Sequence, residues 1–373
     1  MTLAQRQQFR LKGYDTVFER NGKVFAVNSA EINNWSEEKK SDFRTQTDLV
    51  AFEDDHGDTV FYDPEYFQVD EDNDLSYYGT QTSGIPQPIN LRRCYEYLFS
   101  HWGGSSLDLE DWDMSRAESI SCMFEACFYL ENLSVRGWNL QNCEYATWLL
   151  EGCRHLKSID FSGWDTPILR KLDFAFSGCA LLQEIDLSNL DTHNLQSAPQ
   201  LFKQCEHLKS VNLAGLNLSK AIDLTGLFFG CSSLEKVNMH GVQTSSTLKC
   251  IANMFRYCES LESVDVSTLC VSSVKEFINV FANCSKLKSV SLQGWSVTSG
   301  EIFANLFYCD ESLENVDLGV FKQHAIAAID TFNAFFGCNK LLNKYSYTDS
   351  SEFADDVFGA GVKQKVQPQR ITI

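Results

Sequence analysis

Apolar and polar positions recur along most of the chain with a period of 26 residues. The stretch Cys153–Thr166 reads C-R-H-L-K-S-I-D-F-S-G-W-D-T, and near copies begin at Cys179, Cys205 and Cys284. A fixed period of this length is typical of a solenoid, in which each unit stacks on the next. The cysteine that opens each copy, here called the anchor, stands at Cys127, Cys153, Cys179, Cys205, Cys231, Cys258, Cys284 and Cys338.

Two polar residues extend the count of units. His101 stands 26 residues before Cys127, and Asp310 takes the place of the cysteine in the unit between Cys284 and Cys338. With these two positions included, we expect about ten units.

The order of residues within each unit predicts a short strand and a return path. A bulky residue stands three places before the anchor, and L-x-x-(L/I/V)-x-(L/V/F/M) follows the anchor. In the unit of Cys258 the apolar positions are Leu261, Val264 and Val266, and the alternation of the last two places both on one side of a strand. Stacking in register then gives a parallel sheet along one side of the coil, with the bulky residue and the anchor in the core.

Tryptophan stands eleven places after several anchors and alternates there with leucine from unit to unit. Because leucine replaces it, we expect the tryptophan to fill the core at the turn rather than to form a binding hot spot. The tryptophans are Trp112, Trp138, Trp164 and Trp295, and the leucines are Leu190, Leu216 and Leu269.

The pattern F-x-x-C-x-x-L-x-x-(I/V)-D-(L/F)-S-x-(W/L)-D-T resembles the BspA-type leucine-rich repeat, a family of 26-residue surface-protein repeats, over roughly residues 98–342. The resemblance implies a curved repeat array that binds other macromolecules, and it implies no catalytic residues. The chain departs from the pattern at His101, Asp310 and Lys344, where the last unit loses its strand. We therefore expect an α/β repeat solenoid with a parallel sheet on one face, preceded by a small, mostly β N-terminal domain.

Residues 1–90 do not repeat, and their local patterns predict small β elements. Asn-Gly between two apolar runs is typical of a tight hairpin, and Gly and Pro mark loops. The expected elements are a hairpin of Thr16–Arg20 with Lys23–Asn28, a short helix over Ser36–Phe43, a second hairpin of Leu49–Glu53 with Thr59–Tyr62, an acidic run at Asp70–Asp74 and a loop at Gly79–Pro88.

These patterns divide the chain into three parts. Residues 1–90 form either a cap for the exposed end of the array or a separate partner-binding domain, since a solenoid end needs a cap. Residues 91–344 form the array. Residues 345–373 form a C-terminal cap and tail, with Tyr345–Phe358 closing the far end.

The formal net charge of −19 over 373 residues argues against nucleic acid as a direct partner, because phosphate binding needs a cationic surface. It fits a partner with a basic surface. Met1–Asp15 lacks the apolar run of a signal peptide, and no stretch of about 20 apolar residues predicts a membrane span. We expect a cytoplasmic protein; the alternative is a secreted or cell-surface protein whose signal peptide has been removed.

The chain has 14 cysteines, of which eight are anchors. Equivalent atoms of stacked turns lie roughly 4.8 Å apart, so distance alone does not exclude disulfides. Their Cβ vectors are parallel, however, which is unfavourable for the disulfide torsion, and free cysteine packs as a small apolar group. We expect reduced anchors in the core.

The motifs of common catalytic sites are absent from the sequence, so we expect no cofactor, no metal and no enzyme activity. Cys153 with His155 and Cys205 with His207 form C-x-H pairs, in which the cysteine should face the core and the histidine the solvent. An enzyme with its site in the N-terminal segment is the alternative of another class.

One row of outward residues lies between the two core positions of the strands. Its candidate partner-binding members, here called the acidic row, are Asp108, Asp160, Asp186, Asn212, Asn238, Asp265 and Asp317; Ser134 and Ser291 complete it. Such residues either cap the following turn or receive a basic partner. The flanking positions do not favour one sign, because Lys157, Lys209 and Lys288 alternate there with Glu131, Glu235, Glu262 and Glu314.

These observations favour non-enzymatic protein–protein recognition by a repeat array. One specific role is an intracellular binder or inhibitor, of viral or mobile-element origin, that covers the basic nucleic-acid groove of a partner. The alternative is a secreted or cell-surface adhesin that binds host or matrix proteins, as many relatives of the resembled family do.

Overall fold

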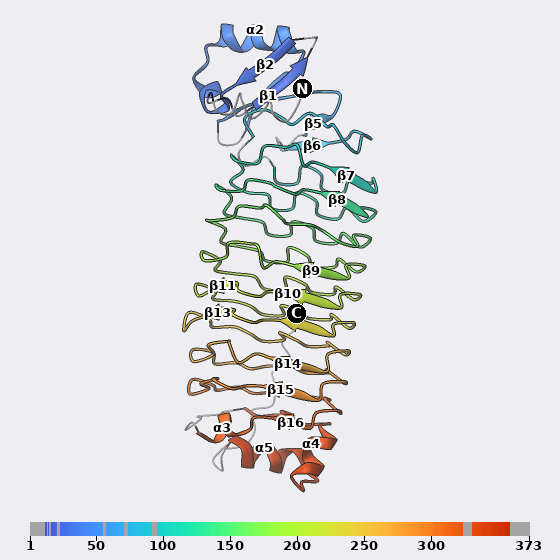
Figure 1. The fold of residues 1–373 in the computed structure, drawn as a ribbon, viewed down its shortest axis with the longest axis vertical. Helices are drawn as coiled ribbons and strands as arrows, with labels where there is room; N and C mark the ends of the chain where they lie inside the picture. Colours follow the sequence, from blue (N-terminus) through green and yellow to red (C-terminus); the bar gives the residue numbers. More distant parts are fainter. Residues whose placement is uncertain are drawn as a thin grey trace.

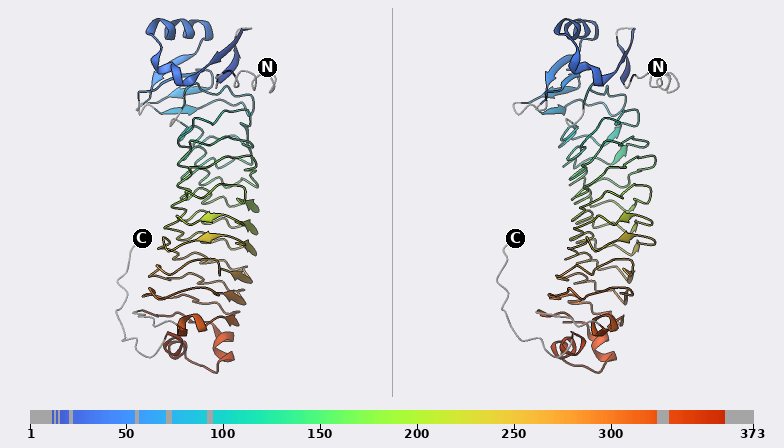
Figure 2. Two further views of the ribbon diagram at one scale, coloured as in Figure 1. Left: turned by 60° about the vertical axis from the view of Figure 1, so that its left-hand side comes forward. Right: turned by 90° about the vertical axis from the view of Figure 1, so that its left-hand side faces the viewer.

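The computed structural model describes residues 12, 14, 16–20, 23–54, 57–70, 74–91, 95–323 and 330–358 (Figure 1). The described chain is an elongated stack of coils, with a group of strands and a helix at one end and short helices at the other (Figure 2). Within the described chain, single-residue bridges mark nine equivalent positions on successive turns, one fewer than the ten units expected.

The short strands of the array form parallel pairs whose partners stand 26 residues apart. Val211 lies between Ile185 and Val237, so equivalent core positions face one another in register. The strands are β7 (Ser106–Asp108), β8 (Asn132–Ser134), β9 (Glu184–Asp186), β10 (Ser210–Asn212), β12 (Lys236–Asn238), β14 (Ser263–Asp265), β15 (Ser289–Ser291) and β16 (Asn315–Val316).

The sheet is divided into three segments, β7-β8, β9-β10-β12 and β14-β15-β16, rather than being continuous. One break falls in the unit of Cys153, where residues 158–160 form no strand. The second core position of this unit is Phe161, and its ring packs 4.7 Å from the ring of Trp164 and 5.6 Å from that of Phe176. The break thus occurs in a unit whose second core position has a phenylalanine, which is larger than the Leu or Val of most other units.

The return path consists of turns and isolated bridges, so the α/β class is not confirmed. Between residues 95 and 318 of the described chain no helix occurs. Single-residue bridges instead join equivalent positions of successive turns, and β11 (Asn217–Leu218) pairs with β13 (Gln243–Thr244). The structure is therefore a parallel β-solenoid. The bridged residues are Ser119, Tyr145, Lys171, Ser197, Asp223 and Cys250, followed by Glu276, Ile302 and Asp330.

A column of phenylalanine rings runs through the core at the position three before the anchor. Successive rings from Phe176 to Phe335 stack with centroids 5.2–5.6 Å apart. The repeat tryptophans are buried as predicted, and each indole N–H donates to a backbone carbonyl 27 or 29 residues earlier in the chain; for Trp138 the acceptor is Leu109 O at 2.9 Å. The core is thus one continuous column of apolar side chains.

The first unit begins one residue later than the sequence spacing suggests. His101 has φ 60° and donates its backbone N–H to Glu125 O. Ala126, the residue before the anchor Cys127, has the same left-handed backbone conformation and the same kind of bond to the next turn. The structural equivalent of the anchor is therefore Trp102, which is buried, and Phe99 is the first ring of the column, 5.6 Å from Phe124. The assignment of His101 as an anchor is wrong by one position.

Both N-terminal hairpins predicted from the sequence are confirmed, and the helix is longer than predicted. The Ser36 side chain caps it by accepting from Lys39 N. A third hairpin was not predicted: the acidic run contains its connection, with residues 71–73 outside the described part. The elements are β1 (Thr16–Arg20), β2 (Lys23–Val27), a 3-10 helix (Ser29–Asn34), α2 (Glu37–Thr47), β3 (Val50–Glu53), β4 (Thr59–Tyr62), β5 (Phe67–Val69) and β6 (Leu75–Tyr77).

The N-terminal residues contribute to two apolar clusters. One is continuous with the core of the array and includes Val60, Phe67, Leu75, Tyr77 and Ile85. The other is small and separate, and its buried members are Val27, Ile32, Leu49, Phe61 and Ile89. This end of the chain thus covers the first turn and has a small core of its own, while the domain boundary near residue 90 stays a prediction.

Helices close the other end of the array. After Cys338 the chain forms α4 (Asn339–Lys344) where a strand would follow, and α3 (Gly319–Gln323) and α5 (Ser350–Phe358) lie beside it (Figure 1). The rings of Phe353 and Phe358 pack 5.0 and 6.0 Å from Phe335, the last ring of the column. The expected tail at 359–373 lies outside the described residues.

Candidate functional site

The strand face of the array presents the acidic row to solvent. The members of the row are exposed, except Asn212, which is half-buried. They repeat once per turn, so neighbouring side chains lie roughly one strand spacing, 4.8 Å, apart where the strands pair. The row is broken only by the small side chains of Ser134 and Ser291.

Each member of the row also caps the turn that follows its strand, which is the first of the two roles considered for these residues from the sequence. Asp160 Oδ1 accepts from Ser162 N at 2.8 Å, and Asp186 and Asp265 accept from the backbone N–H two residues on at 2.8 and 3.0 Å. The same bond occurs at Asp108, Asn212, Asn238 and Asp317. Capping fixes each carboxylate on the strand face.

The bonds to serine hold the pKa of Asp160, Asp186 and Asp265 below the usual range, because the side chain and backbone N–H of the serine two residues on stabilise the anion. These three carboxylates are therefore ionised at neutral pH. In the middle of the row, Asn212 Nδ2 donates to Asp186 at 3.0 Å and Asn238 Nδ2 donates to Asn212 at 2.9 Å. The amides separate the carboxylates and relieve their repulsion.

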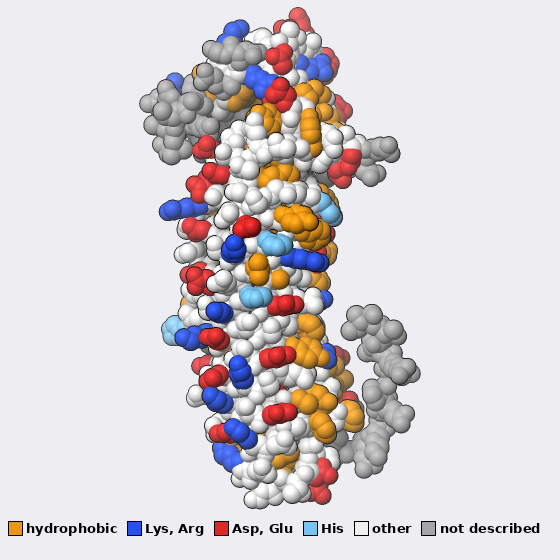
Figure 3. Space-filling view, turned by 90° about the vertical axis from the view of Figure 1, so that its right-hand side faces the viewer, with side chains coloured by type: hydrophobic (Ala, Val, Ile, Leu, Met, Phe, Trp, Pro, Cys, Tyr) orange, Lys and Arg blue, Asp and Glu red, His pale blue; other side chains and the backbone are white. Residues whose placement is uncertain are grey.

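The flanking positions form ion pairs between adjacent turns and carry no single sign. Lys157 lies 2.8 Å from Glu131, Lys288 lies 2.8 Å from Glu262, and Lys340 lies 2.8 Å from Glu314. Figure 3 shows this alternation of charge along the face, with hydrophobic side chains gathered along one edge. Among the described residues, no lysine or arginine forms an ion pair with Asp160, Asp186 or Asp265, so the negative charge of the strand face comes from the row itself.

A shallow hollow of about 370 Å³ lies over β14, β15 and β16, at the C-terminal end of the row. Its polar floor includes Asp265, Ser291 and Asp317, and Lys344 of α4 forms one wall. Lys344 Nζ donates to Asn315 Oδ1 at 2.9 Å, so a cation closes this end of the face.

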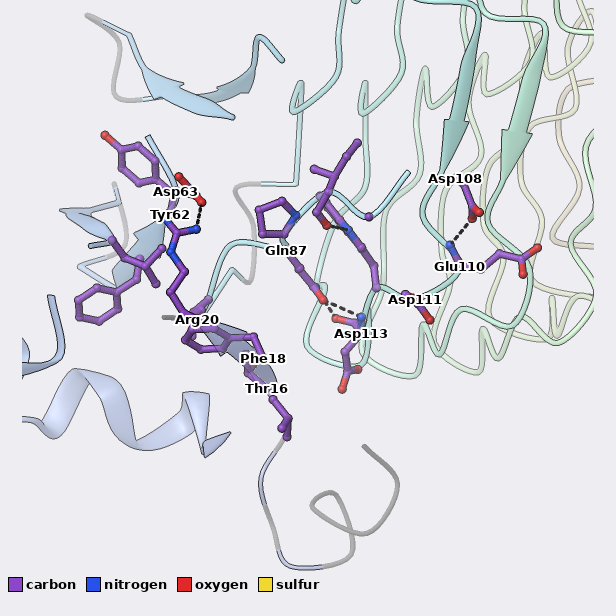
Figure 4. Close-up of a pocket in the computed structure, with 18 residues that line it drawn as sticks. Thr16, Phe18, Arg20, Tyr62, Asp63, Gln87, Asp108, Glu110, Asp111 and Asp113 are labelled. Carbon is purple, nitrogen blue, oxygen red and sulfur yellow. Dashed lines mark hydrogen bonds and ion pairs between the residues drawn. The ribbon is translucent and has the colours of Figure 1, made fainter. Parts of the chain in front are cut away.

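A second concave site, which the sequence predictions missed, lies between β1 and the first turn of the array (Figure 4). This cleft has a volume of about 480 Å³. Phe18, Phe61, Ile85 and Trp112 are among its apolar lining residues. Its carboxylates are Asp63, Asp108, Glu110, Asp111 and Asp113.

Arg20 is the cation among the residues that line the cleft, and it forms an ion pair with Asp63 (Figure 4). The hydrogen bond to Asp63 raises the pKa of Arg20. A sequence signal for the cleft exists, because four of the six residues in D-L-E-D-W-D, residues 108–113, are acidic. The packing of a distant hairpin against them carries no such signal.

The anchor cysteines are free and buried, as predicted. Each thiol donates to a phenylalanine or leucine carbonyl of the preceding turn; Cys205 Sγ lies 3.1 Å from Phe176 O. Burial raises the pKa of Cys205 and Cys258 well above its ordinary value, which leaves both as unreactive thiols.

The C-x-H pairs separate as expected, with Cys153 and Cys205 in the core and His155 and His207 exposed. The ring nitrogen Nδ1 of His155 lies 2.5 Å from Phe128 O, and that of His207 lies 3.0 Å from Ala180 O. In the part of the chain that the structure describes, no group of three or more His, Cys, Asp or Glu side chains is arranged to hold a metal ion. Nor does any helix in that part have the length and apolar character needed to cross a membrane.

The stacked turns, the in-register parallel strands and the buried columns define a repeat protein of the parallel solenoid class. Within this class, the chain belongs to the family described as "Mycoplasma protein of unknown function, DUF285". Its model matches residues 94–162, 133–240 and 222–348, about two thirds of the chain.

No curated protein matches the chain. Among solved structures, a leucine-rich repeat protein from Bacteroides ovatus ATCC 8483 is similar over 78% of this chain and 98% of its own, with 14% sequence identity and a TM-score of 0.34.

Proposed function

We propose that the array recognises another protein through its strand face and that the acidic row receives basic side chains of that partner. The observation that carries this proposal is the capping of each carboxylate. One oxygen of Asp160, Asp186 or Asp265 is fixed by a backbone N–H, and the side chain remains exposed. Binding to such a surface costs little side-chain entropy, because the recognising groups are already ordered.

Charge supports the same choice of partner. The net charge of −19 attracts a basic protein and speeds its encounter. The resemblance of the repeat to the BspA-type leucine-rich repeat also supports macromolecular binding, although fold alone does not define function. An intracellular binder or inhibitor is the specific role that we propose; its viral or mobile-element origin and its cytoplasmic location stay predictions from the sequence.

The test is a pull-down from nuclease-treated lysate of the source cells. The wild-type chain is compared with a row variant that carries Asp160→Asn, Asp186→Asn, Asp265→Asn and Asp317→Asn. Asparagine caps the same turn at Asn212 and Asn238, so this variant should fold. The control variant removes four negative charges from the flanking positions by the substitutions Glu131→Gln, Glu235→Gln, Glu262→Gln and Glu314→Gln.

We expect a partner that binds the wild type and the control, is lost with the row variant, and is released by added salt. The control matches the row variant in net charge, so loss restricted to the row variant places the contact on the row. Equal capture by all three chains would contradict the proposal and move the contact to the N-terminal residues or the opposite face.

A further inference from the structure

Arg256 stands two residues before the anchor Cys258 and has no acidic partner. Its Nη1 donates to Asn253 Oδ1 at 3.4 Å, and its Nη2 donates to Tyr257 Oη at 3.2 Å. Its Cζ lies 5.8 Å from the centre of the Phe229 ring and 4.8 Å from that of the Tyr257 ring. Among the described residues Arg256 forms no ion pair, and its buried Nε has no hydrogen-bond partner. A half-buried guanidinium is thus held in place by neutral groups.

A second cation contacts the same phenylalanine. Lys203 stands at the equivalent position two turns before Arg256, and its Nζ lies 6.0 Å from the centre of the Phe229 ring. Its charge acts on Glu151, but no ion pair joins the two in the described part of the chain. Of the five N–H donors of Arg256, two are in use and one is buried, so each terminal nitrogen keeps one for a ligand. In a chain with a net charge of −19, these two cations make this surface locally attractive to an anionic group.

A row of four asparagines runs beside Arg256, one residue on each turn. These residues, here called the amide row, are Asn253, Asn279, Asn305 and Asn333, and their φ angles lie between 54° and 58°. Asparagine tolerates this left-handed backbone, but Trp148 and Phe174 hold the same position in other turns, so the backbone does not require it. Asn279 Nδ2 donates to Asn253 Oδ1 at 3.0 Å, whereas the Asn305 side chain has no hydrogen bond to another described residue. Each carboxamide can both donate and accept, as the backbone of an extended peptide requires.

Two stacked rings lie two and three turns beyond Arg256 at the equivalent position. The centroids of Tyr308 and Phe336 are 5.4 Å apart, and the two ring planes make an angle of 14°. Phe336 is 48% exposed, while Ala282, between Arg256 and Tyr308, is fully buried beneath its neighbours. Each ring covers one face of the other, so their edges are what a partner meets. Ring edges suit an apolar side chain, whereas a sugar ring packs best on an open aromatic face.

The charge of this surface favours an acidic occupant that approaches beside the amide row. From the turn of Cys205 onward, the positions equivalent to Arg256 and to Asn253 carry no acidic residue. Two exposed glutamates, Glu259 and Glu311, stand three residues further on than the position of Arg256, towards the strand. Their carboxylates repel an anion from the strand side and leave the amide side open to it.

We infer that this surface binds an extended segment of another protein that carries an acidic and an apolar side chain. The carboxylate of the segment pairs with Arg256, and its apolar side chain contacts Tyr308 and Phe336. Its backbone bonds to Asn279 and Asn305. Arg256 and Tyr308 stand two turns apart, roughly 10 Å, a distance that about three residues of extended chain cover. The surface contains no member of the acidic row, so this inference stands or falls independently of the function proposed above.

The probe is the amidated peptide Gly-Glu-Ser-Thr-Phe-Gly with a rhodamine label, followed by fluorescence anisotropy with the full chain. Its acidic and apolar side chains are three residues apart. In one altered peptide glutamine replaces the glutamate, and in another serine replaces the phenylalanine. The label is the same in all three peptides.

The protein variants are Arg256→Gln and Phe336→Ser, each combined with each peptide in a double-mutant cycle. Arg170→Gln is the matched control, because it removes the same charge from a half-exposed side chain that is ion-paired with Glu144. Urea unfolding of each variant shows whether the folded state is retained. The cycle reports the contact itself, so a variant of lower stability still tests the inference.

We expect the parent peptide to bind, and each altered peptide to bind about fivefold more weakly. Arg256→Gln should lose about fivefold in affinity for the parent peptide and less than about twofold for the glutamine peptide, and Phe336→Ser should show the same pattern with the serine peptide. Arg170→Gln should lose less than about twofold. Asn305→Gly removes one amide without backbone strain, since Gly226 holds the same position with φ 60°, and it should lose about threefold.

Four results would overturn the inference. The first is no binding at millimolar protein, and the second is an equal loss of the parent and glutamine peptides on Arg256→Gln, which would exclude the ion pair. The third is displacement of the peptide by equimolar trigalacturonic acid, which would make the occupant an acidic glycan. The fourth is a wild-type dimer in sedimentation that Arg256→Gln abolishes, which would identify a second copy of this chain as the occupant.

Discussion

The carboxyl group of Asp310 accepts a hydrogen bond from the backbone N–H of Cys284, with 2.8 Å between Oδ1 and N. Asp310 stands at an anchor position and is fully buried, yet its other oxygen, Oδ2, has no hydrogen-bond partner. Burial raises the pKa of Asp310 well above its ordinary value. Burial thus favours the neutral acid, which occupies the place where other units have a thiol that donates a hydrogen bond to a carbonyl of the preceding turn.

We predict that Asp310→Cys stabilises the protein at neutral pH. The unfolded chain ionises at this carboxyl near pH 4, whereas the folded chain keeps the proton to higher pH. The folded state therefore binds more protons, and wild-type stability falls as the pH rises above about 4. Urea unfolding should show that the advantage of Asp310→Cys over the wild type grows from pH 4 to pH 7 by the order of 1–3 kcal/mol, because the folded wild type must retain a proton that its unfolded chain loses.

Asp310→Asn separates charge from shape in the same experiment, because it removes the ionisation and keeps the size of the side chain. It should remove the pH dependence even if its own stability is lower. Asp317→Asn, on the exposed strand face, is the control and should leave the pH dependence of unfolding nearly unchanged. A wild-type stability that rises between pH 4 and pH 7 relative to both Asp310 variants would contradict the argument.

The phenylalanine column predicts a large cost for a single truncation. Phe228 is fully buried, with the rings of Phe202 and Phe255 at 5.5 and 5.2 Å. Phe228→Ala should lower the free energy of unfolding by about 3–5 kcal/mol, through lost burial and the cavity left between two turns. Phe229→Ala is the neighbouring control; its half-buried ring should cost about 1 kcal/mol or less. Similar losses for the two variants would show that the column is not a major source of stability.

The sequence predicted the array well because its repeated units constrain one another. A single apolar residue such as Leu261 or Val264 does not define a fold. The same spacing after many anchors, however, leaves one parallel register that buries the apolar residues of all the units. The errors fall where the repetition ends. His101 was assigned by a spacing of 26, whereas its backbone matches Ala126, 25 residues on, and Trp102 fills the anchor position.

The candidate sites were less predictable for a physical reason. The acidic row could be located, because the outward positions of a strand follow from the alternation of apolar and polar residues. Whether Asp265 caps a turn or is available only to a partner depends on the local backbone, however, which the pattern does not define. The cleft depends on how β1, some 90 residues from Trp112, packs against the first turn. No local pattern in the chain encodes that contact.

Thiol reactivity should distinguish the buried anchors from the exposed Cys250. Cys250 is exposed, while the anchors Cys205 and Cys231 are fully buried and their pKa is raised by burial. In a short iodoacetamide pulse at pH 8 on the folded protein, peptide mass spectrometry should find Cys250 alkylated and both anchors unmodified. The anchors should react only after unfolding in denaturant. Fast alkylation of Cys205 or Cys231 in the native chain would contradict the reduced, closed core described for the array.

The caps of the acidic row should make a measurable contribution to stability that depends on pH. Asp265 Oδ1 accepts from Ser267 N at 3.0 Å, and the side chain of Ser267 together with this backbone bond lowers the pKa of Asp265. Asp265→Ala should lower the free energy of unfolding by about 0.5–1.5 kcal/mol at pH 7, the net value of one hydrogen bond, and Asp265→Asn should cost less because the amide oxygen still caps. Unfolding in urea at pH 7 and pH 3 measures both differences.

The sign of the pH effect at Asp265 follows from the lowered pKa. The stabilisation by the anion is present above the unfolded pKa of about 3.9 and is lost as the pH falls through the folded value. The gap between wild type and Asp265→Asn should therefore narrow as the pH falls from 7 to 3, while the gap to Asp265→Ala remains in part, because the protonated carboxyl still accepts. If Asp265→Ala were as stable as wild type at pH 7, the cap would contribute nothing, and the ordered carboxylates on which the proposed function depends would lose their support.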